Sequence, residues 1–158
     1  METIYLNTPV GTLEIKGDID GLAFVNFIDP EESESKIISE SLQNTVQQLS
    51  EYFEGNRINF KLKLNPEGTF FQKKVWQQIK DIPFGKTASY QEIANQLGDP
   101  KAIRAAASAN GKNPIAIIIP CHRVIDSDGS LIGYAGGLHR KKWLLEHENP
   151  VKQQSLFN

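Results

Sequence analysis

An uninterrupted apolar run over residues 115–119, Ile-Ala-Ile-Ile-Ile, constrains this chain more than any other segment, because such a run has to be buried. It ends directly at residues 120–123, Pro-Cys-His-Arg, which hold the only cysteine of the chain. The pattern predicts a buried strand that delivers Cys121 to its end, beside a histidine and an arginine.

A thiol placed in this way is a candidate nucleophile. Only the thiolate attacks, and a nearby positive charge or a relayed base lowers a thiol pKa from about 8.5 toward neutrality. The alternative for Cys121 is an inert core residue, since free cysteine is among the most buried residue types. The adjacent Cys121 and His122 do not separate the two interpretations by themselves, so the surrounding sequence has to decide.

The first 68 residues have the pattern of a small α+β domain. Strands are expected at residues 12–16 and 22–28, separated by a Gly-Asp turn. Strict apolar alternation predicts a further strand at residues 57–64. Between them, apolar residues recur at helical spacing over residues 38–53. Residues 65–68, Asn-Pro-Glu-Gly, are expected to form the linker to a second domain.

Two capping boxes predict helix starts in the second half. Thr69 with Gln72 begins one helix, and Ser89 with Glu92 begins a shorter one. The Asp-Pro pair at residues 99–100 predicts a third helix start. A short helix, a tight turn and a second helix have helix-turn-helix spacing, although two packed helices without a DNA role are the commoner case.

The charge is distributed unevenly along the chain. The net charge is −2, but residues 1–66 carry 5 Lys/Arg against 11 Asp/Glu, whereas residues 67–158 carry 12 against 8. Attraction to phosphate depends on where the positive charge lies, so the second half is suited to binding DNA. The alternative is that these are ordinary solvated charges whose uneven distribution arose by chance. One cysteine excludes an intramolecular disulfide and fits a reducing compartment. No signal peptide or membrane span is evident, and we expect a cytoplasmic monomer, associated with the nucleoid if the source is bacterial.

Several segments in order resemble one family, the methylated-DNA–protein-cysteine methyltransferases, also called O6-alkylguanine-DNA alkyltransferases. The segments that carry the resemblance are residues 84–90, 104–107, 113–125, 133–137 and 142–148. The resemblance is strong over residues 69–149 and general in layout over the first 68. It implies an α+β fold with a sheet-plus-helix domain at residues 1–68. A helical domain with a winged-helix-like helix-turn-helix would follow at 69–150, and a flexible tail at 151–158.

The resemblance implies a DNA-repair reaction without a cofactor. The alkyl group of O6-alkylguanine in double-stranded DNA, and of O4-alkylthymine as a second candidate, would move irreversibly to Cys121 in a single turnover. Residues 1–68 contain neither Cys nor His, so we expect no zinc site there. Three alternatives are a non-reacting alkyl-lesion sensor, a winged-helix regulator and a cysteine hydrolase. Cys121 counts against the sensor, and the regulator leaves Cys121 without a purpose.

The resemblance also implies roles for five catalytic residues. Cys121 is the nucleophile, His122 accepts its proton through a water, and Glu148 orients the histidine. Tyr90 donates to the leaving guanine, although taken alone it is a half-buried aromatic. Asn113 links the helix-turn-helix to the active-site segment. Four further residues are expected to line the guanine pocket: Val124, Tyr134, Ala135 and Gly136.

DNA contacts are expected from the second helix of the helix-turn-helix. Arg104 matches the family arginine that fills the gap left by an extruded nucleotide, and without the family it is a solvated charge. The small side chains of Ala105 and Ser108 suit close approach to the minor groove. Arg123 is assigned to the same surface.

The tail carries a separate pattern. Residues 153–157, Gln-Gln-Ser-Leu-Phe, resemble the short peptide that bacterial repair proteins insert into the replicative sliding clamp. The predicted contacts are Gln153, Leu156 and Phe157. The alternative is a tail folded back on its own domain.

Overall fold

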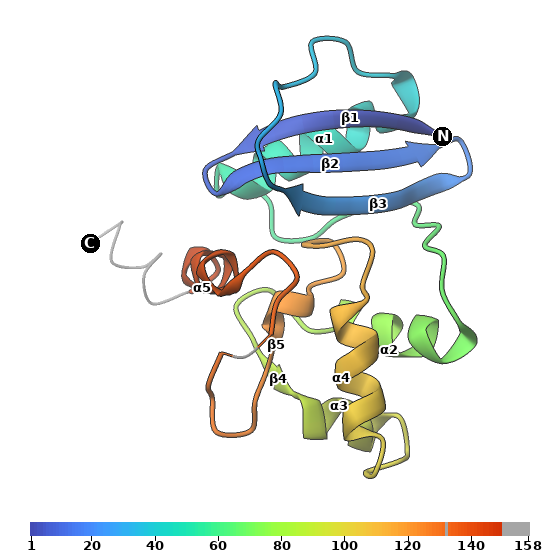
Figure 1. Cartoon of the computed structure of the whole chain (residues 1–158), viewed down its shortest axis with the longest axis vertical. Helices are drawn as coiled ribbons and strands as arrows, with labels where there is room; N and C mark the ends of the chain where they lie inside the picture. The colour runs from blue at the N-terminus through green and yellow to red at the C-terminus, as the bar shows by residue number, and fades with distance from the viewer. Residues whose placement is uncertain (132, 150–158) are drawn as a thin grey trace. The chain divides into compact units, whose positions relative to one another are not determined.

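The computed structural model describes residues 1–131 and 133–149, and the chain divides into two compact units, the second beginning at Gly68. The first unit is an antiparallel sheet in the order β1-β2-β3 with one helix, α1, packed against it (Figure 1). Its elements are β1 (Glu2–Thr8), β2 (Gly11–Asp18), β3 (Gly21–Ile28) and α1 (Glu40–Phe53).

The core of the first unit follows from the strand register. Ile4 pairs with Ile15, which pairs with Val25, so three buried aliphatic side chains form one cross-strand row. Residues two apart along a strand point to the same face, and a second buried row lies beside the first. Its members are Leu6, Leu13 and Phe27. The helix α1 contributes Leu42, Leu49 and Tyr52 to the buried set.

The strand expected at residues 57–64 is wrong. This segment is extended, but its one described pairing is an isolated bridge between Leu64 and Leu22. Gln48 of α1 takes both backbone groups of Lys61: its side-chain oxygen accepts from the Lys61 N–H at 2.9 Å, and its nitrogen donates to the Lys61 carbonyl at 3.1 Å. A helix side chain therefore replaces the strand partner that the alternation implied.

The second unit is helical with a two-stranded parallel sheet between distant segments. Both capping boxes are present, with Gln72 N donating to Thr69 Oγ1 and Glu92 N to Ser89 Oγ, each at 3.0 Å. Each cap stabilises its helix by about 1 kcal/mol. The elements are α2 (Phe70–Lys80), β4 (Ala88–Ser89), α3 (Tyr90–Gln96), α4 (Ile103–Gly111), the 3-10 turn η1 (Cys121–Arg123), β5 (Val124–Ile125) and α5 (Leu138–His147). The predicted α+β class is confirmed.

Helix α4 begins later than the Asp-Pro pair predicts. Asp99 caps a separate turn, in which its carboxylate accepts from Lys101 N at 3.0 Å, and the α-helix starts at Ile103. The helix is fixed on its buried side by Trp76 of α2, whose indole N–H donates to the Ala109 carbonyl at 2.8 Å. This bond positions the helix that follows the tight turn.

The apolar run at residues 115–119 is fully buried, as predicted, but it is not a strand. Apart from a single bridge position at Ile115, the run is folded by local hydrogen bonds, from Ile118 N to the Ala116 carbonyl and from Ile119 N to the Ile115 carbonyl. Ile117 has a φ of 73°, a left-handed conformation that is a genuine outlier for a β-branched residue. An apolar run therefore predicts burial but does not predict conformation, which here depends on hydrogen bonds to neighbouring polar groups.

None of the helices within the described ranges combines the length and the apolar character needed to cross a bilayer.

Candidate active site

The turn η1 presents three consecutive buried side chains. Cys121 is 8% exposed, His122 is 0% exposed and Arg123 is 5% exposed. Two backbone hydrogen bonds stabilise the turn: Cys121 N donates to the Ile119 carbonyl at 2.8 Å, and Arg123 N donates to the Pro120 carbonyl at 2.9 Å. Cys121 therefore lies in a buried, hydrogen-bonded turn. Such a turn holds the side chain in one position, as a nucleophile requires.

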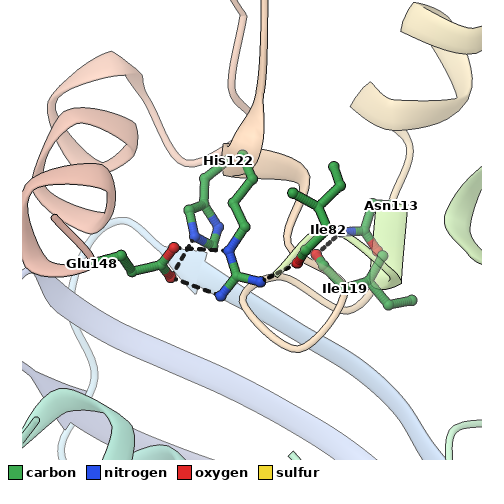
Figure 2. A network of polar contacts seen from close by, with 6 residues as sticks. Ile82, Asn113, Ile119, His122 and Glu148 are labelled. Atoms are coloured by element: carbon green, nitrogen blue, oxygen red, sulfur yellow. Dashed lines mark hydrogen bonds and ion pairs between the residues drawn. The ribbon is translucent and has the colours of Figure 1, made fainter. Parts of the chain in front are cut away.

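Glu148, at the end of α5, binds the two residues that follow the cysteine, His122 and Arg123 (Figure 2). His122 Nε2 lies 2.8 Å from one carboxylate oxygen. Arg123 Nε donates to the other oxygen at 2.8 Å, and Nη2 donates to the first at 3.1 Å. The remaining guanidinium nitrogen, Nη1, donates to the Ile82 carbonyl. The carboxylate, 1% exposed, is therefore satisfied by one imidazole and one bidentate guanidinium.

The ionisation of this network follows from its contacts. Burial by itself would raise the pKa of Glu148, but the hydrogen bonds and charges of His122 and Arg123 lower it to about 2. Burial lowers the pKa of His122, although Glu148 opposes that shift. We therefore take the resting pair as a carboxylate and a neutral imidazole, with the proton on Nε2 where the carboxylate accepts it.

The second imidazole nitrogen is then a base. His122 Nδ1 is buried and makes no hydrogen bond to any group in the described part of the chain. In the Nε2–H tautomer this nitrogen carries a lone pair. A buried acceptor without a hydrogen bond costs free energy, because it has lost its hydration. Its presence in the site therefore calls for an explanation. It is available to take a proton from the neighbouring thiol.

Cys121 is not ionised in advance. Burial raises the pKa of the thiol, while a hydrogen bond from Asn113 and the positive charge of Lys141 lower it. Since burial dominates, the thiol is protonated at neutral pH and needs a base before it attacks. The site thus places a protonated thiol beside a neutral imidazole and an ionised carboxylate, which is the set of groups that base-assisted nucleophilic catalysis uses.

Asn113 fixes the segment that leads to the cysteine. Its side-chain nitrogen donates to the Ile119 carbonyl at 2.8 Å, and its oxygen accepts from Ile115 N at 3.0 Å (Figure 2). One amide thereby closes the apolar run into a loop and lies against the thiol. This placement is consistent with the predicted linking role of Asn113.

The pKa values of the two tyrosines expected at the site are both raised, in part by the negative charge of an ionised Cys121. Tyr90 is the first residue of α3 and half-buried, and burial raises its pKa, with hydrogen bonding to Asn110 opposing. Burial raises the pKa of Tyr134 well above 10. The Tyr134 hydroxyl makes no hydrogen bond to the described residues. Both phenols are therefore neutral donors at neutral pH.

The expected pocket residues lie on two backbone segments. Val124 follows η1 directly and is buried, whereas Ala135 is exposed and Gly136 is buried in the loop before α5. Gly137 ends that loop with a φ of 94°, and a Cβ there would lie 2.9 Å from the His139 ring. A glycine is needed at this helix start.

Two buried cations at this loop are absent from the sequence prediction. Arg140 Nη1 donates to the Gly136 carbonyl at 3.1 Å, and Lys141 Nζ donates to the Val124 carbonyl at 2.8 Å. The sequence does contain a signal for the burial of Lys141, which is its helical spacing. Lys141 precedes Leu144 by three residues and Leu144 precedes Glu148 by four, so the three side chains share one helix face. That face is buried, although two of its three members are charged.

The exposed face of α4 carries the expected DNA contacts. Arg104, Ala105 and Ser108 are exposed, while Ala106 and Ala109 are buried on the opposite side. The exposed face of α4 therefore carries small side chains and one positive charge, Arg104, near the N-terminus of the helix.

Arg123 does not belong to that surface, which corrects the expectation that it contacts DNA. Its side chain is buried and its guanidinium is bound to Glu148 and to the Ile82 carbonyl. The residue is a structural partner of the Glu148 carboxylate. The predicted tail contacts, Gln153, Leu156 and Phe157, lie outside the described residues.

No group of three or more His, Cys, Asp or Glu side chains is placed to share a metal ion within residues 1–131 and 133–149.

Two family models match the chain. The model of the 6-O-methylguanine DNA methyltransferase DNA-binding domain matches residues 70–150, and that of the ribonuclease-like domain of the same enzymes matches residues 1–66. Similar proteins include the methylated-DNA–protein-cysteine methyltransferase of Methanosarcina acetivorans, which is 47% identical over 146 residues, spanning 89% of this chain and 94% of the relative. The protein of the same name from Mycobacterium leprae is 44% identical over 147 residues, spanning 90% and 89%.

Solved structures give the same result. The crystal structure of Mycobacterium tuberculosis O6-methylguanine methyltransferase superimposes with a TM-score of 0.85 at 39% identity, covering 99% of both chains. A structure of the M. tuberculosis protein in complex with DNA superimposes with a TM-score of 0.83 at 40% identity, covering 98% of both. The likeness extends over both units of the chain.

Proposed function

The chain belongs to the 6-O-methylguanine DNA methyltransferase family, and on that basis we propose that Cys121 is the residue that accepts the alkyl group from the damaged base. Its activity is that of a methylated-DNA–protein-cysteine methyltransferase, which repairs O6-methylguanine in DNA. The observation that carries the assignment to Cys121 is the neighbouring His122, which is bonded to Glu148 through one nitrogen and has its other nitrogen unpaired.

The proposed reaction begins with a proton transfer. The Cys121 thiol gives its proton to His122 Nδ1, directly or through one water, and Glu148 stabilises the imidazolium that forms. The carboxylate is suited to this step because its pKa of about 2 keeps it ionised across the working range.

The transfer then exchanges one bond for another. The thiolate sulfur forms a bond to the alkyl carbon, and the bond between that carbon and guanine O6 breaks with its electrons moving to the base. The guanine regains a proton, for which the neutral Tyr90 hydroxyl is the proposed donor. The proton taken up by His122 is then released to solvent, and the Tyr90 phenolate regains its proton from solvent. The product is a thioether on Cys121 and an intact guanine, so each protein molecule acts once and no external cofactor takes part. O4-alkylthymine is a second candidate substrate, because it presents the same alkyl–oxygen bond.

The protein binds DNA, as its DNA-binding domain model and the DNA complex of the M. tuberculosis relative support. The alkylated oxygen lies inside the duplex, so the nucleotide has to be extruded, which costs a few kcal/mol of unstacking. We assign this work to the exposed face of α4: Ala105 and Ser108 permit close approach, and Arg104 occupies the space left by the base. The pocket for the extruded base would be lined by Val124, Tyr134, Ala135 and Gly136.

A transfer experiment tests the proposal. The protein is incubated with a duplex oligonucleotide containing O6-methylguanine, digested, and its peptides are mapped by mass spectrometry. The methyl group is expected on Cys121. Cys121→Ala should bind the same duplex and leave it methylated, since the thiol contributes chemistry and not phosphate contact. Transfer to another residue would overturn the assignment.

A second partner is proposed from the sequence of the tail alone. Gln153 would fix the peptide by hydrogen bonds, while Leu156 and Phe157 fill an apolar groove of a bacterial sliding clamp. A synthetic peptide of residues 151–158 should bind purified clamp, and Leu156→Ala with Phe157→Ala should remove that binding and leave alkyl transfer intact. Loss of transfer in the double variant would instead indicate a tail packed on its own domain.

A further inference from the structure

Lys141 is a charged side chain in an unusual position. It lies in the first half of α5 and is 0% exposed. Its ammonium donates to the Val124 carbonyl at 2.8 Å and to the Gly133 carbonyl at 3.3 Å. Lysine is almost never fully buried, because removing an ammonium from water is expensive. A buried lysine that binds backbone carbonyls therefore calls for a function.

The two carbonyls, of Val124 and Gly133, belong to two backbone segments that lie nine residues apart in the sequence. Val124 follows the catalytic turn directly, and Gly133 begins the loop that leads through Tyr134 to α5. Arg140, the preceding residue of the helix, holds the Gly136 carbonyl at 3.1 Å. Consecutive cations of α5 thus anchor both backbone segments expected to line the substrate pocket.

The charge of Lys141 also acts on the nucleophile. The ammonium lowers the pKa of Cys121, and the ionised thiol in turn raises the pKa of Lys141, which burial lowers. The two groups therefore stabilise each other only in the state with a thiolate and an ammonium. That state is the one from which the alkyl group is attacked.

Other groups face the thiol, and none of them supplies this permanent charge. His122 lies next to it in η1 and is neutral at rest, because burial lowers its pKa. Tyr90 of α3 and Tyr134 of the pocket loop are neutral phenols with raised pKa values. Asn113 contributes a hydrogen bond without a charge.

We propose that Lys141 is a positioning residue of the alkyl transfer, a buried cation that holds Val124 and Gly133 at the rim of the Cys121 pocket and stabilises the thiolate before attack. The proposal rests on the transfer function proposed above. It assigns the permanent charge to α5, while His122 and Glu148 move the proton. The same helix carries Lys141 near its beginning and Glu148 at its end, so both charges that serve the reaction come from one rigid element.

The test measures the thiol without DNA. The rate of Cys121 alkylation by iodoacetamide is followed against pH for the full-length protein and for Lys141→Met. The variant should show an apparent thiol pKa higher by about one unit, and therefore about tenfold slower alkylation below that pKa. Lys141→Arg should restore the wild-type profile at least in part, because it restores the charge. Lys142→Met is the matched control: it removes the same charge from the adjacent, exposed position and should leave the profile unchanged.

A second measurement keeps the test valid if Lys141→Met does not fold. In the wild-type protein labelled with 13C-lysine, the Lys141 resonance should titrate at lower pH after Cys121 has been methylated, because the thiolate that raised its pKa is gone. An unchanged thiol pKa in a folded Lys141→Met, or an unchanged Lys141 titration after methylation, overturns the proposal. Neither readout depends on repair of DNA by the variant. Absence of methyl transfer in the wild-type protein would instead count against the proposed function.

Discussion

His122 and Glu148, 26 positions apart in the sequence, are joined by a hydrogen bond of 2.8 Å between the imidazole Nε2 and a carboxylate oxygen, and both side chains are buried. The bond fixes the tautomer of the imidazole and leaves Nδ1 free to serve as the base. In the proposed reaction this single carboxylate governs the proton transfer from Cys121.

Replacing Glu148 with Gln should slow the transfer by about 10²-fold, the lower end of the range for general-base contributions. The imidazolium loses its anionic partner, so accepting the thiol proton becomes harder and the pH–rate profile moves to higher pH. The measurement is the rate of reaction with free O6-benzylguanine across pH. Glu146→Gln, an exposed position on the same helix, is the control and should react normally. A profile for Glu148→Gln that matches the wild type would remove the residue from the mechanism.

The same network predicts acid sensitivity. Glu148 has a pKa of about 2 in the folded protein against an ordinary value of 4.5, so its contribution to stability is complete above pH 4.5 and is lost as the pH falls toward 2. The difference corresponds to about 3 kcal/mol. His122 adds to the loss, because its lowered pKa means that the unfolded chain takes up a proton first as the pH falls below 6.5. Denaturant unfolding of wild type and Glu148→Gln at several pH values measures this; parallel losses in both proteins would contradict it.

Arg123 is expected to matter for stability and not for DNA affinity. Replacing it with Ala leaves the Glu148 carboxylate buried with one partner fewer, and removing one member of a buried ion pair costs about 3–5 kcal/mol. Chemical denaturation measures the loss. The salt dependence of DNA binding, which counts phosphate contacts, should stay the same for the folded variant. A reduced salt dependence would return Arg123 to the DNA surface.

Arg104→Ala should separate base extrusion from chemistry. Repair of a duplex substrate should become much slower, whereas reaction with free O6-benzylguanine should keep its rate, because a free base needs no extrusion. Parallel assays on the two substrates give the comparison. Equal losses on both would mean that Arg104 acts through the stability of α4.

Local signals in the sequence predicted local structure well. Both capping boxes begin helices at Phe70 and Tyr90 because their hydrogen bonds span only three residues. Signals that depend on distant partners were less informative. The alternation at residues 57–64 indicated a strand, but Gln48 takes the backbone groups of Lys61 that a strand partner would have used.

The site shows the same division. Family motifs identified Cys121, His122 and Glu148 as residues to bring together, and the structure places His122 and Glu148 in contact. The position of Arg123 was misjudged, because a basic residue in a motif suggests phosphate, and only the fold shows a buried carboxylate beside it. Lys141 was missed because charged residues on a helix are normally exposed, and burial of this one depends on the carbonyls of Val124 and Gly133.

The stoichiometry of repair tests the central claim most directly. The protein is mixed with an increasing molar excess of O6-methylguanine duplex, and the repaired guanines are counted at completion together with the mass of the intact protein. Direct transfer to Cys121 predicts a plateau at one repaired guanine per protein molecule, one methyl group on every molecule, and no repair by Cys121→Ala. Repair that continues beyond one equivalent, or that leaves Cys121 unmodified, would contradict the account.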